Sequence, residues 1–88
     1  MRARKVDTTQ ASIVDALRDA GCLVLVVNGA IDLLVCRGKQ NYILECKGAS
    51  LRWTQTQKRM VGEGWPITFV RTPADALRAV GLWSGKSW

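Results

Sequence analysis

Three charged residues, Asp32, Glu45 and Lys47, lie inside apolar stretches of the chain, where charged side chains are costly to bury. Two carboxylates that share a buried surface repel each other, because burial disfavours their charged forms. A divalent cation removes this repulsion, and a nearby lysine adds to the relief. Hard oxygen ligands with room for water suit Mg²⁺ or Mn²⁺. Asp32 and Glu45 are therefore candidate ligands of such a cation.

The turn between the two stretches decides whether the two acids meet. A two-residue turn at Gly38-Lys39, with glycine at its first central position, places Arg37 opposite Gln40. Counting back along both strands then places Asp32 directly opposite Glu45, and directly opposed residues share a face of a sheet. A turn one residue longer would put Asp32 on the other face, and a turn two residues longer would restore the pairing.

Lys47 lies two positions after Glu45 and therefore shares its face of the strand. The same residues also have a structural interpretation. Glu45 and Lys47 would form a satisfied ion pair at a sheet edge, with Asp32 in a turn, because buried acids do occur when they are paired. Both interpretations stay open on the residues alone.

Seven elements are expected to position these residues, in the order helix, three strands, helix, strand, helix. Asn28-Gly29 is a strong signal for a hairpin after the first strand. Thr54 and Gln57 have the spacing of a capping box, and Thr72 before a proline suits the start of the last helix. The predicted ranges are 7–21, 22–27, 31–37, 41–47, 54–61, 66–70 and 73–80.

The fold class predicted from this order is α/β, with a mixed sheet flanked by helices in a single domain of residues 1–88. Both faces of the second and third strands are apolar, so helices are expected on both sides of the sheet. A domain of this size has a small core, and a metal, a partner or self-association would add to its stability.

Composition narrows the class of protein. The net charge is +6 and the sequence pI is about 9.8, which favours a polyanionic partner, nucleic acid before membrane. No apolar run approaches the ~20 residues of a membrane span, and no signal-peptide segment follows the basic start, so a cytoplasmic protein is expected. Without histidine or C-x-x-C spacing, no zinc site is expected. Cys22, Cys36 and Cys46 lie in apolar runs, which predicts reduced core residues.

The spacing of Asp32 and Glu45-Cys46-Lys47, within this order of elements, resembles the PD-(D/E)XK nucleases. More narrowly, the chain is similar to their VRR-NUC domains, in the compact form found in phages and bacteria. The matching stretches are residues 7–11, 16–21, 32–35, 42–48 and 57, which span nearly the whole chain. The resemblance implies a restriction-endonuclease-like αβββαβ core, to which this chain adds a C-terminal helix.

The resemblance also implies a hydrolase that acts on DNA. Asp32, Glu45 and the backbone carbonyl of Cys46 would bind one or two Mg²⁺ (or Mn²⁺) ions, which polarise the scissile phosphate and lower the pKa of the attacking water. Lys47 would orient that water or steady the developing charge. Gln57 is the family's further polar position near the catalytic residues, and its alternative role is half of the capping box.

The chain departs from the family pattern at two positions, and neither is one of the expected catalytic or metal-binding residues. Ser12 stands where the family often carries glutamate, so a metal contact from the first helix is lost or weakened. Ile31 replaces the proline that usually precedes the first catalytic acid, and the loop before it is short. Neither change removes a core catalytic group, although the activity of this chain could be weaker than that of the family at large.

Candidate DNA contacts lie around the second helix. Arg52, Lys58 and Arg59 would contact phosphates, with solvated helix-face charges as the alternative. Trp83 and Trp88 lie in a short tail with glycine and serine. Aromatic residues in such a tail are expected to pack on their own domain or on a partner, in preference to stacking on bases.

The function implied by the resemblance is a structure-specific DNA-repair endonuclease that cuts branched DNA, with four-way (Holliday) junctions as the expected substrate. Relatives of the compact form pair as two-fold dimers, and a junction offers two equivalent strands about its own two-fold axis, so a homodimer is expected. Its apolar interface would draw on Trp83 or Trp88. The expected setting is the cytoplasm of a bacterial or phage-infected cell. The alternatives are a non-catalytic nucleic-acid-binding module and a monomeric nuclease acting on flaps or nicks.

Overall fold

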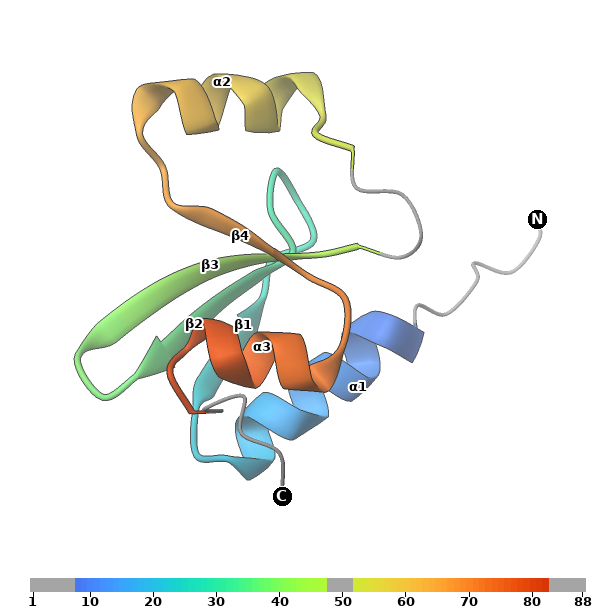
Figure 1. The fold of residues 1–88 in the computed structure, drawn as a ribbon, viewed down its shortest axis with the longest axis vertical. Helices are drawn as coiled ribbons and strands as arrows, with labels where there is room; N and C mark the ends of the chain where they lie inside the picture. The colour runs from blue at the N-terminus through green and yellow to red at the C-terminus, as the bar shows by residue number, and fades with distance from the viewer. Residues whose placement is uncertain (1–7, 48–51, 83–88) are drawn as a thin grey trace.

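The computed structural model describes residues 8–47 and 52–82, and it shows an α/β fold with one four-stranded mixed sheet (Figure 1). The strands are β1 Leu23–Val26, β2 Leu33–Arg37, β3 Gln40–Cys46 and β4 Ile67–Val70. The helices are α1 Thr8–Asp19, α2 Gln55–Glu63 and α3 Pro73–Ala79. Within the sheet the order is β1-β2-β3-β4; the first three strands pair antiparallel, and β4 runs parallel to β3. The predicted fold class and order of elements are confirmed, although Asp7, the predicted first residue of the first helix, lies outside the described residues.

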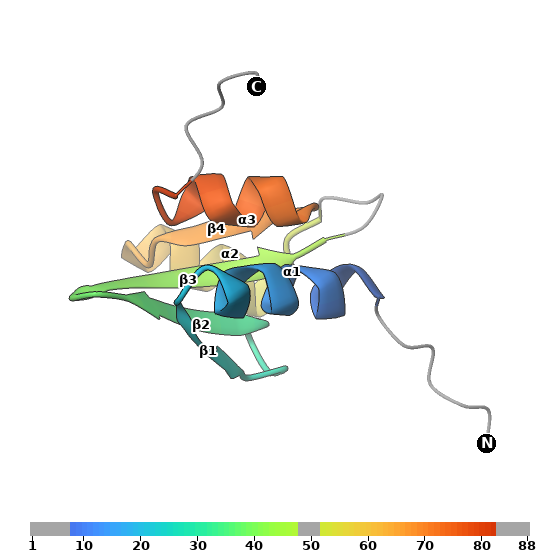
Figure 2. The ribbon, with the colours of Figure 1, turned by 90° about the horizontal axis from the view of Figure 1, so that it is seen from below.

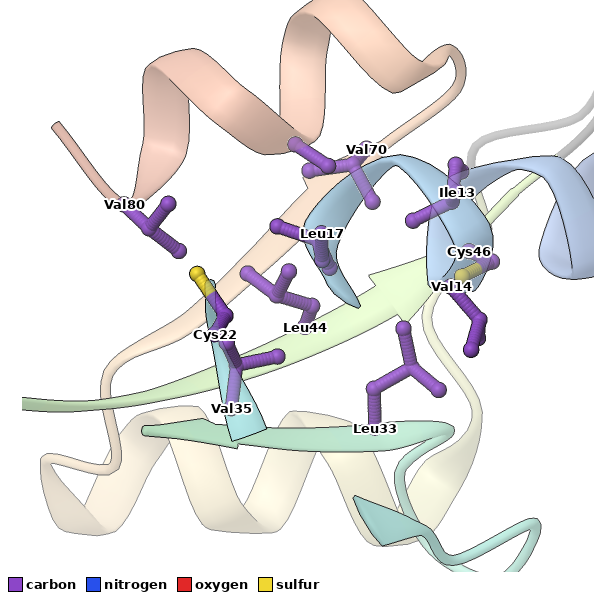
Figure 3. Packing of buried hydrophobic residues seen from close by; sticks show 11 residues of the cluster. Ile13, Val14, Leu17, Cys22, Leu33, Val35, Leu44, Cys46, Val70 and Val80 are labelled. Carbon is purple, nitrogen blue, oxygen red and sulfur yellow. The ribbon is translucent and has the colours of Figure 1, made fainter. Parts of the chain in front are cut away.

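Helices α1 and α3 lie side by side on one face of the sheet, and α2 lies on the opposite face (Figures 1 and 2). The hydrophobic core fills the space between the sheet and the pair α1 and α3 (Figure 3). Strand residues alternate between the two faces, so the opposed residues Leu33 and Leu44 both point into this core. The core residues are Ile13, Val14, Leu17, Cys22, Leu33, Val35, Leu44, Cys46, Val70, Ala76 and Val80.

The β2–β3 hairpin has the predicted register. Gly38 is the first residue of a two-residue turn and has φ = +61°, a left-handed value that glycine adopts without strain. The residues on either side of the turn pair with each other, and the pairing continues to Leu33 opposite Leu44. Asp32 directly precedes Leu33, and Glu45 directly follows Leu44, so the side chain of Glu45 lies on the face of the sheet opposite the core. Helix α2 lies on that face (Figure 1).

The β1–β2 connection is an antiparallel hairpin, as the signal at Asn28 predicts, but β2 begins at Leu33 and not at Ile31. The backbone N–H groups of Val27 and Asn28 both donate to the carbonyl of Asp32, at 2.8 and 3.2 Å. Asn28 has a left-handed φ of +52°, a conformation that asparagine tolerates better than most residues. The predicted strand start is wrong because these bonds close a loop around the residues before Leu33.

Side chains bond the free backbone groups at the starts of α2 and α3. Thr54 and Gln57 form the predicted capping box, in which each side chain accepts a hydrogen bond from the other's backbone N–H at 3.1 Å. Thr72 caps α3 as predicted, by accepting from the N–H of Asp75 at 3.0 Å. The N–H of Arg71 donates to the Asp75 carboxylate, which holds the pKa of that carboxyl below its usual value.

The described helices are also short. None of them combines the length and the apolar character that crossing a membrane would need.

Part of the sheet face opposite the core is exposed and apolar. Leu23 and Leu25 in β1 are 72% and 60% exposed, and Leu34 in β2 is 38% exposed. Leu25 pairs directly with Leu34, so the three side chains form one surface, here called the β1–β2 patch. The expectation that helices cover both faces of the sheet is therefore correct only in part, because α2 leaves this patch uncovered.

The placement of the core predicts different costs for two leucines. Leu44→Ala should lower the free energy of unfolding by about 2–5 kcal/mol, because it opens a cavity among fully buried side chains. Leu23→Ala removes the same atoms from a side chain that is exposed in the single chain, and it should cost the monomer less than about 0.5 kcal/mol. Urea denaturation of both variants measures the difference, and equal losses would contradict this placement.

Candidate functional site

Asp32 is bonded through both its backbone and its side chain. Its carbonyl closes the β1–β2 loop, and its carboxylate oxygen Oδ2 accepts a hydrogen bond from the backbone N–H of Cys46 at 2.8 Å. Cys46 follows Glu45 directly, so the first acid is joined to the peptide next to the second. The structure thus brings Asp32 to the end of β3, where the register predicted it would meet Glu45.

Glu45 is buried with one satisfied and one unsatisfied carboxylate oxygen. The residue is 7% exposed, and its Oε2 lies 3.3 Å from Nζ of Lys47. Its Oε1 is buried and has no hydrogen-bond partner among the described residues. A buried oxygen that carries charge without a donor is unfavourable, because it has lost its water and gained no partner. A cation beside Oε1 would remove this cost, so the donor set fits a hard divalent metal.

Lys47 is placed by contacts on both sides. Its backbone N–H donates to the carbonyl of Val70 at 2.9 Å, which ties it to β4. Its ammonium pairs with Glu45 and lies 5.3 Å from the centroid of the Phe69 ring, within the range of a cation–π interaction. The ring of Trp53 packs on Phe69 with centroids 4.0 Å apart. The lysine side chain therefore has little freedom to leave the acid.

Phe69 is the site residue that the sequence alone did not indicate. It lies opposite Glu45 in the parallel pairing of β3 with β4. The two strands are parallel and are joined by a long connection through α2. No short turn between them fixes which residues pair, so this register cannot be read from the sequence. The only sequence signal was the position of an aromatic residue in a short strand, which does not distinguish this contact from ordinary packing.

Gln57 lies in α2 and is 2% exposed. Its Oε1 accepts from the backbone N–H of Thr54, and its Nε2 donates to the carbonyl of Ala30 at 3.0 Å. The capping-box role is confirmed, and the bond to Ala30 was not anticipated. Both ends of its amide are thus bonded to backbone groups. A direct catalytic role for Gln57 stays a prediction.

The groups that could hold a metal are the carboxylates of Asp32 and Glu45 and the backbone carbonyl of Cys46. In the described part of the chain, no group of three or more histidine, cysteine or acidic side chains is arranged to hold a metal ion. The hydroxyl of Ser12 donates to the carbonyl of Thr9 at 3.1 Å, at an exposed position of α1. Mg²⁺ suits so small a donor set, because it keeps several waters and binds through one or two carboxylates together with substrate phosphates. The predicted carbonyl ligand, that of Cys46, belongs to the same short segment.

Of the other predicted residues, three have exposed side chains and two lie outside the described residues. Arg52 is exposed in the segment before α2, and Lys58 and Arg59 are exposed within the helix. Their predicted phosphate contacts stay predictions. Trp83 and Trp88 lie outside the described residues.

The three cysteines are free, and two of them are part of the core as predicted. Cys22 and Cys46 are buried, and burial raises the pKa of the Cys22 thiol. Cys36 is half-buried, and its Sγ donates to the carbonyl of Gly38 at 3.3 Å. A raised thiol pKa lowers the thiolate fraction, so Cys22 is expected to react slowly with alkylating reagents.

The bond between Asp32 and Cys46 predicts a stability difference between two substitutions. Asp32→Ala leaves a buried N–H without its acceptor and should lower the free energy of unfolding by about 1–3 kcal/mol. Asp32→Asn keeps an oxygen in the same place and should lose much less. Urea denaturation without added metal distinguishes the two variants. If they are equally stable, the carboxylate does not bind Cys46 as described.

No protein-family model, curated protein or solved structure matches this chain. The geometry of the two acids and the lysine, together with the charge of the chain, is therefore what supports a function.

Proposed function

We propose that this protein is a metal-dependent endodeoxyribonuclease that hydrolyses phosphodiester bonds in branched DNA. The observation that carries the proposal is the buried, unpartnered Oε1 of Glu45, one residue from the peptide that binds the Asp32 carboxylate. A carboxylate oxygen without a donor, close to the end of β3 where a second carboxylate is bound, suits a divalent cation that binds through one or two carboxylates. The basic charge of the chain favours a polyanionic substrate.

The residues of the site have separate roles in this proposal. Asp32, Glu45 and the carbonyl of Cys46 would bind Mg²⁺ or Mn²⁺. When bound, the cation would polarise the scissile phosphate and make a water molecule more acidic. The hydrogen bond from Cys46 to Asp32 fixes where the first carboxylate lies before any metal arrives, so little reorganisation is needed on binding.

Lys47 would supply positive charge to the substrate phosphate. Its ammonium is close to Glu45, and the Phe69 ring limits its movement. Charge that is already oriented stabilises the negative charge that develops on phosphate oxygens during hydrolysis. Lys47 would hold its charge beside Glu45, where a substrate phosphate bound at the metal site would meet it.

One observation favours the second candidate, a nucleic-acid-binding module without catalysis. The Glu45–Lys47 pair at 3.3 Å is the ion pair that this alternative requires. An ion pair accounts for Oε2 of Glu45 but leaves Oε1 without a donor among the described residues. The nuclease proposal accounts for both oxygens and is therefore preferred.

Neutralising the site should abolish cleavage without unfolding the protein. With Mg²⁺ and a four-way junction, Asp32→Asn, Glu45→Gln and Lys47→Ala should each lower the cleavage rate by roughly 100-fold or more, since each removes charge that the transition state needs. Junction binding, measured by fluorescence anisotropy in Ca²⁺, should stay close to wild type. Glu63→Gln is the matched control, because it neutralises an exposed acid at the end of α2.

Two results would decide against this proposal. The first is wild-type cleavage by any of the three variants, which would place the catalytic centre elsewhere. The second is tight binding of single strands, duplexes, flaps and four-way junctions by the wild-type protein with no cleavage in Mg²⁺ or Mn²⁺, which would support the binding module.

The proposal includes a homodimer acting on the two equivalent strands of a four-way junction. The β1–β2 patch is unsuited to DNA, because its three leucines offer nothing to phosphates. The nearby Arg18 donates to the carbonyl of Val24, which holds part of its guanidinium at the β1 backbone. An exposed apolar patch on a small domain is typical of protein–protein contacts, and a second copy would bury the leucines against identical residues.

The dimer proposal is tested by mass. Wild-type protein at micromolar concentration should scatter light as twice the 9.7 kDa chain, and Leu25→Glu should shift it toward the monomer, because it buries charge in an apolar interface. Val61→Glu, at an exposed apolar position in α2, is the matched control and should remain dimeric. A wild-type mass near 9.7 kDa with single nicks on junctions would instead support the monomeric flap or nick nuclease.

A further inference from the structure

We propose that Gln57 is a positioning residue that sets the place of Asp32 through the carbonyl of Ala30. This inference rests on the proposed function, since it concerns the metal-binding carboxylate of that site. Gln57 is almost fully buried, and its amide joins two backbone groups that are distant in sequence, the N–H of Thr54 and the carbonyl of Ala30. It therefore connects α2 to the β1–β2 loop, which rises from the sheet toward this helix in Figure 1.

The capping box alone does not explain why this residue is glutamine. Only Oε1 takes part in the box, and a glutamate at the same position would accept the Thr54 N–H equally well. What glutamine adds is the Nε2 donor, and that donor is used on Ala30. The helix cap therefore does not require the hydrogen bond from Gln57 to Ala30 in the β1–β2 loop.

The loop carries this constraint to Asp32 over two residues. Its other end is fixed by the N–H groups of Val27 and Asn28, which donate to the Asp32 carbonyl. The side chain of Gln10, in α1, donates to Asn28 at 2.9 Å on the opposite side. The loop is thus fixed between two helices, and the Ala30 carbonyl is its attachment to α2. A shift of that carbonyl would move the following residues and the Asp32 carboxylate away from the Cys46 N–H.

Three substitutions separate the two bonds of Gln57. Gln57→Glu keeps the cap acceptor and loses the donor to Ala30. Gln57→Leu loses both bonds without adding charge, which controls for the new carboxylate. Thr54→Ala is the matched control, because it removes the hydroxyl half of the capping box and leaves the Gln57–Ala30 bond in place.

Two readouts test the proposal, and the first needs neither metal nor DNA. In the metal-free protein, the Cys46 amide should exchange with solvent faster in both Gln57 variants than in wild type or Thr54→Ala, with the Leu44 amide of the same strand as reference. The second readout is cleavage of a four-way junction at saturating Mg²⁺. There kcat should fall roughly 10- to 100-fold in both Gln57 variants, as for other groups that orient metal ligands, with KM for DNA little changed. Thr54→Ala should lower the Tm and leave kcat near wild type.

The outcomes are distinguishable. If Cys46 exchange and kcat in the Gln57 variants match those of Thr54→Ala, Gln57 is only a helix cap and the inference is overturned. If the wild-type protein cleaves no DNA, the proposed function fails. In that case the exchange of the Cys46 amide in the metal-free protein still decides whether Gln57 positions Asp32.

Discussion

The hydrogen bond from the Cys46 N–H to the Asp32 carboxylate is the interaction on which the geometry of the site depends. It joins the residue just before β2 to the last residue of β3, and it places one acid beside the peptide of the other. The bond is possible only because the β2–β3 turn has two residues, since a register shifted by one position would send Asp32 to the core face. A local property of Gly38 therefore determines which charged groups meet at the far end of the hairpin.

The two faces of β3 have different roles. Even-numbered residues such as Leu44 and Cys46 pack in the core under α1 and α3. The odd-numbered residues Glu45 and Lys47 lie on the other face, where the contacts of Lys47 include Phe69 from β4. A strand that contributes apolar side chains to the core can tolerate charged residues on the opposite face, provided that they pair with each other. The core thus holds β3 in place, and Glu45 and Lys47 add little to that packing.

Much of this arrangement could be predicted from the sequence, and the missing parts share a cause. The β2–β3 register and the caps at Thr54 and Thr72 follow from residues close together in the chain, and all three are confirmed. The contact of Lys47 with Phe69 and the bond from Gln57 to Ala30 join segments that are brought together only by the packed fold. The pattern of apolar residues also did not show that α2 would leave the β1–β2 patch exposed, because covered and exposed strands can have the same composition.

The edge strand β1 ends the sheet with backbone groups that a neighbouring strand does not use. Arg18 reaches back from α1 to donate to the carbonyl of Val24 at 2.9 Å on this edge. A strand added here would have to displace the guanidinium, so growth of the sheet by edge-to-edge pairing is opposed. The edge of β1 and the face of the sheet beside it thus differ in character: a charged side chain is bonded to the backbone at the edge, whereas the leucines of the β1–β2 patch are exposed on the face.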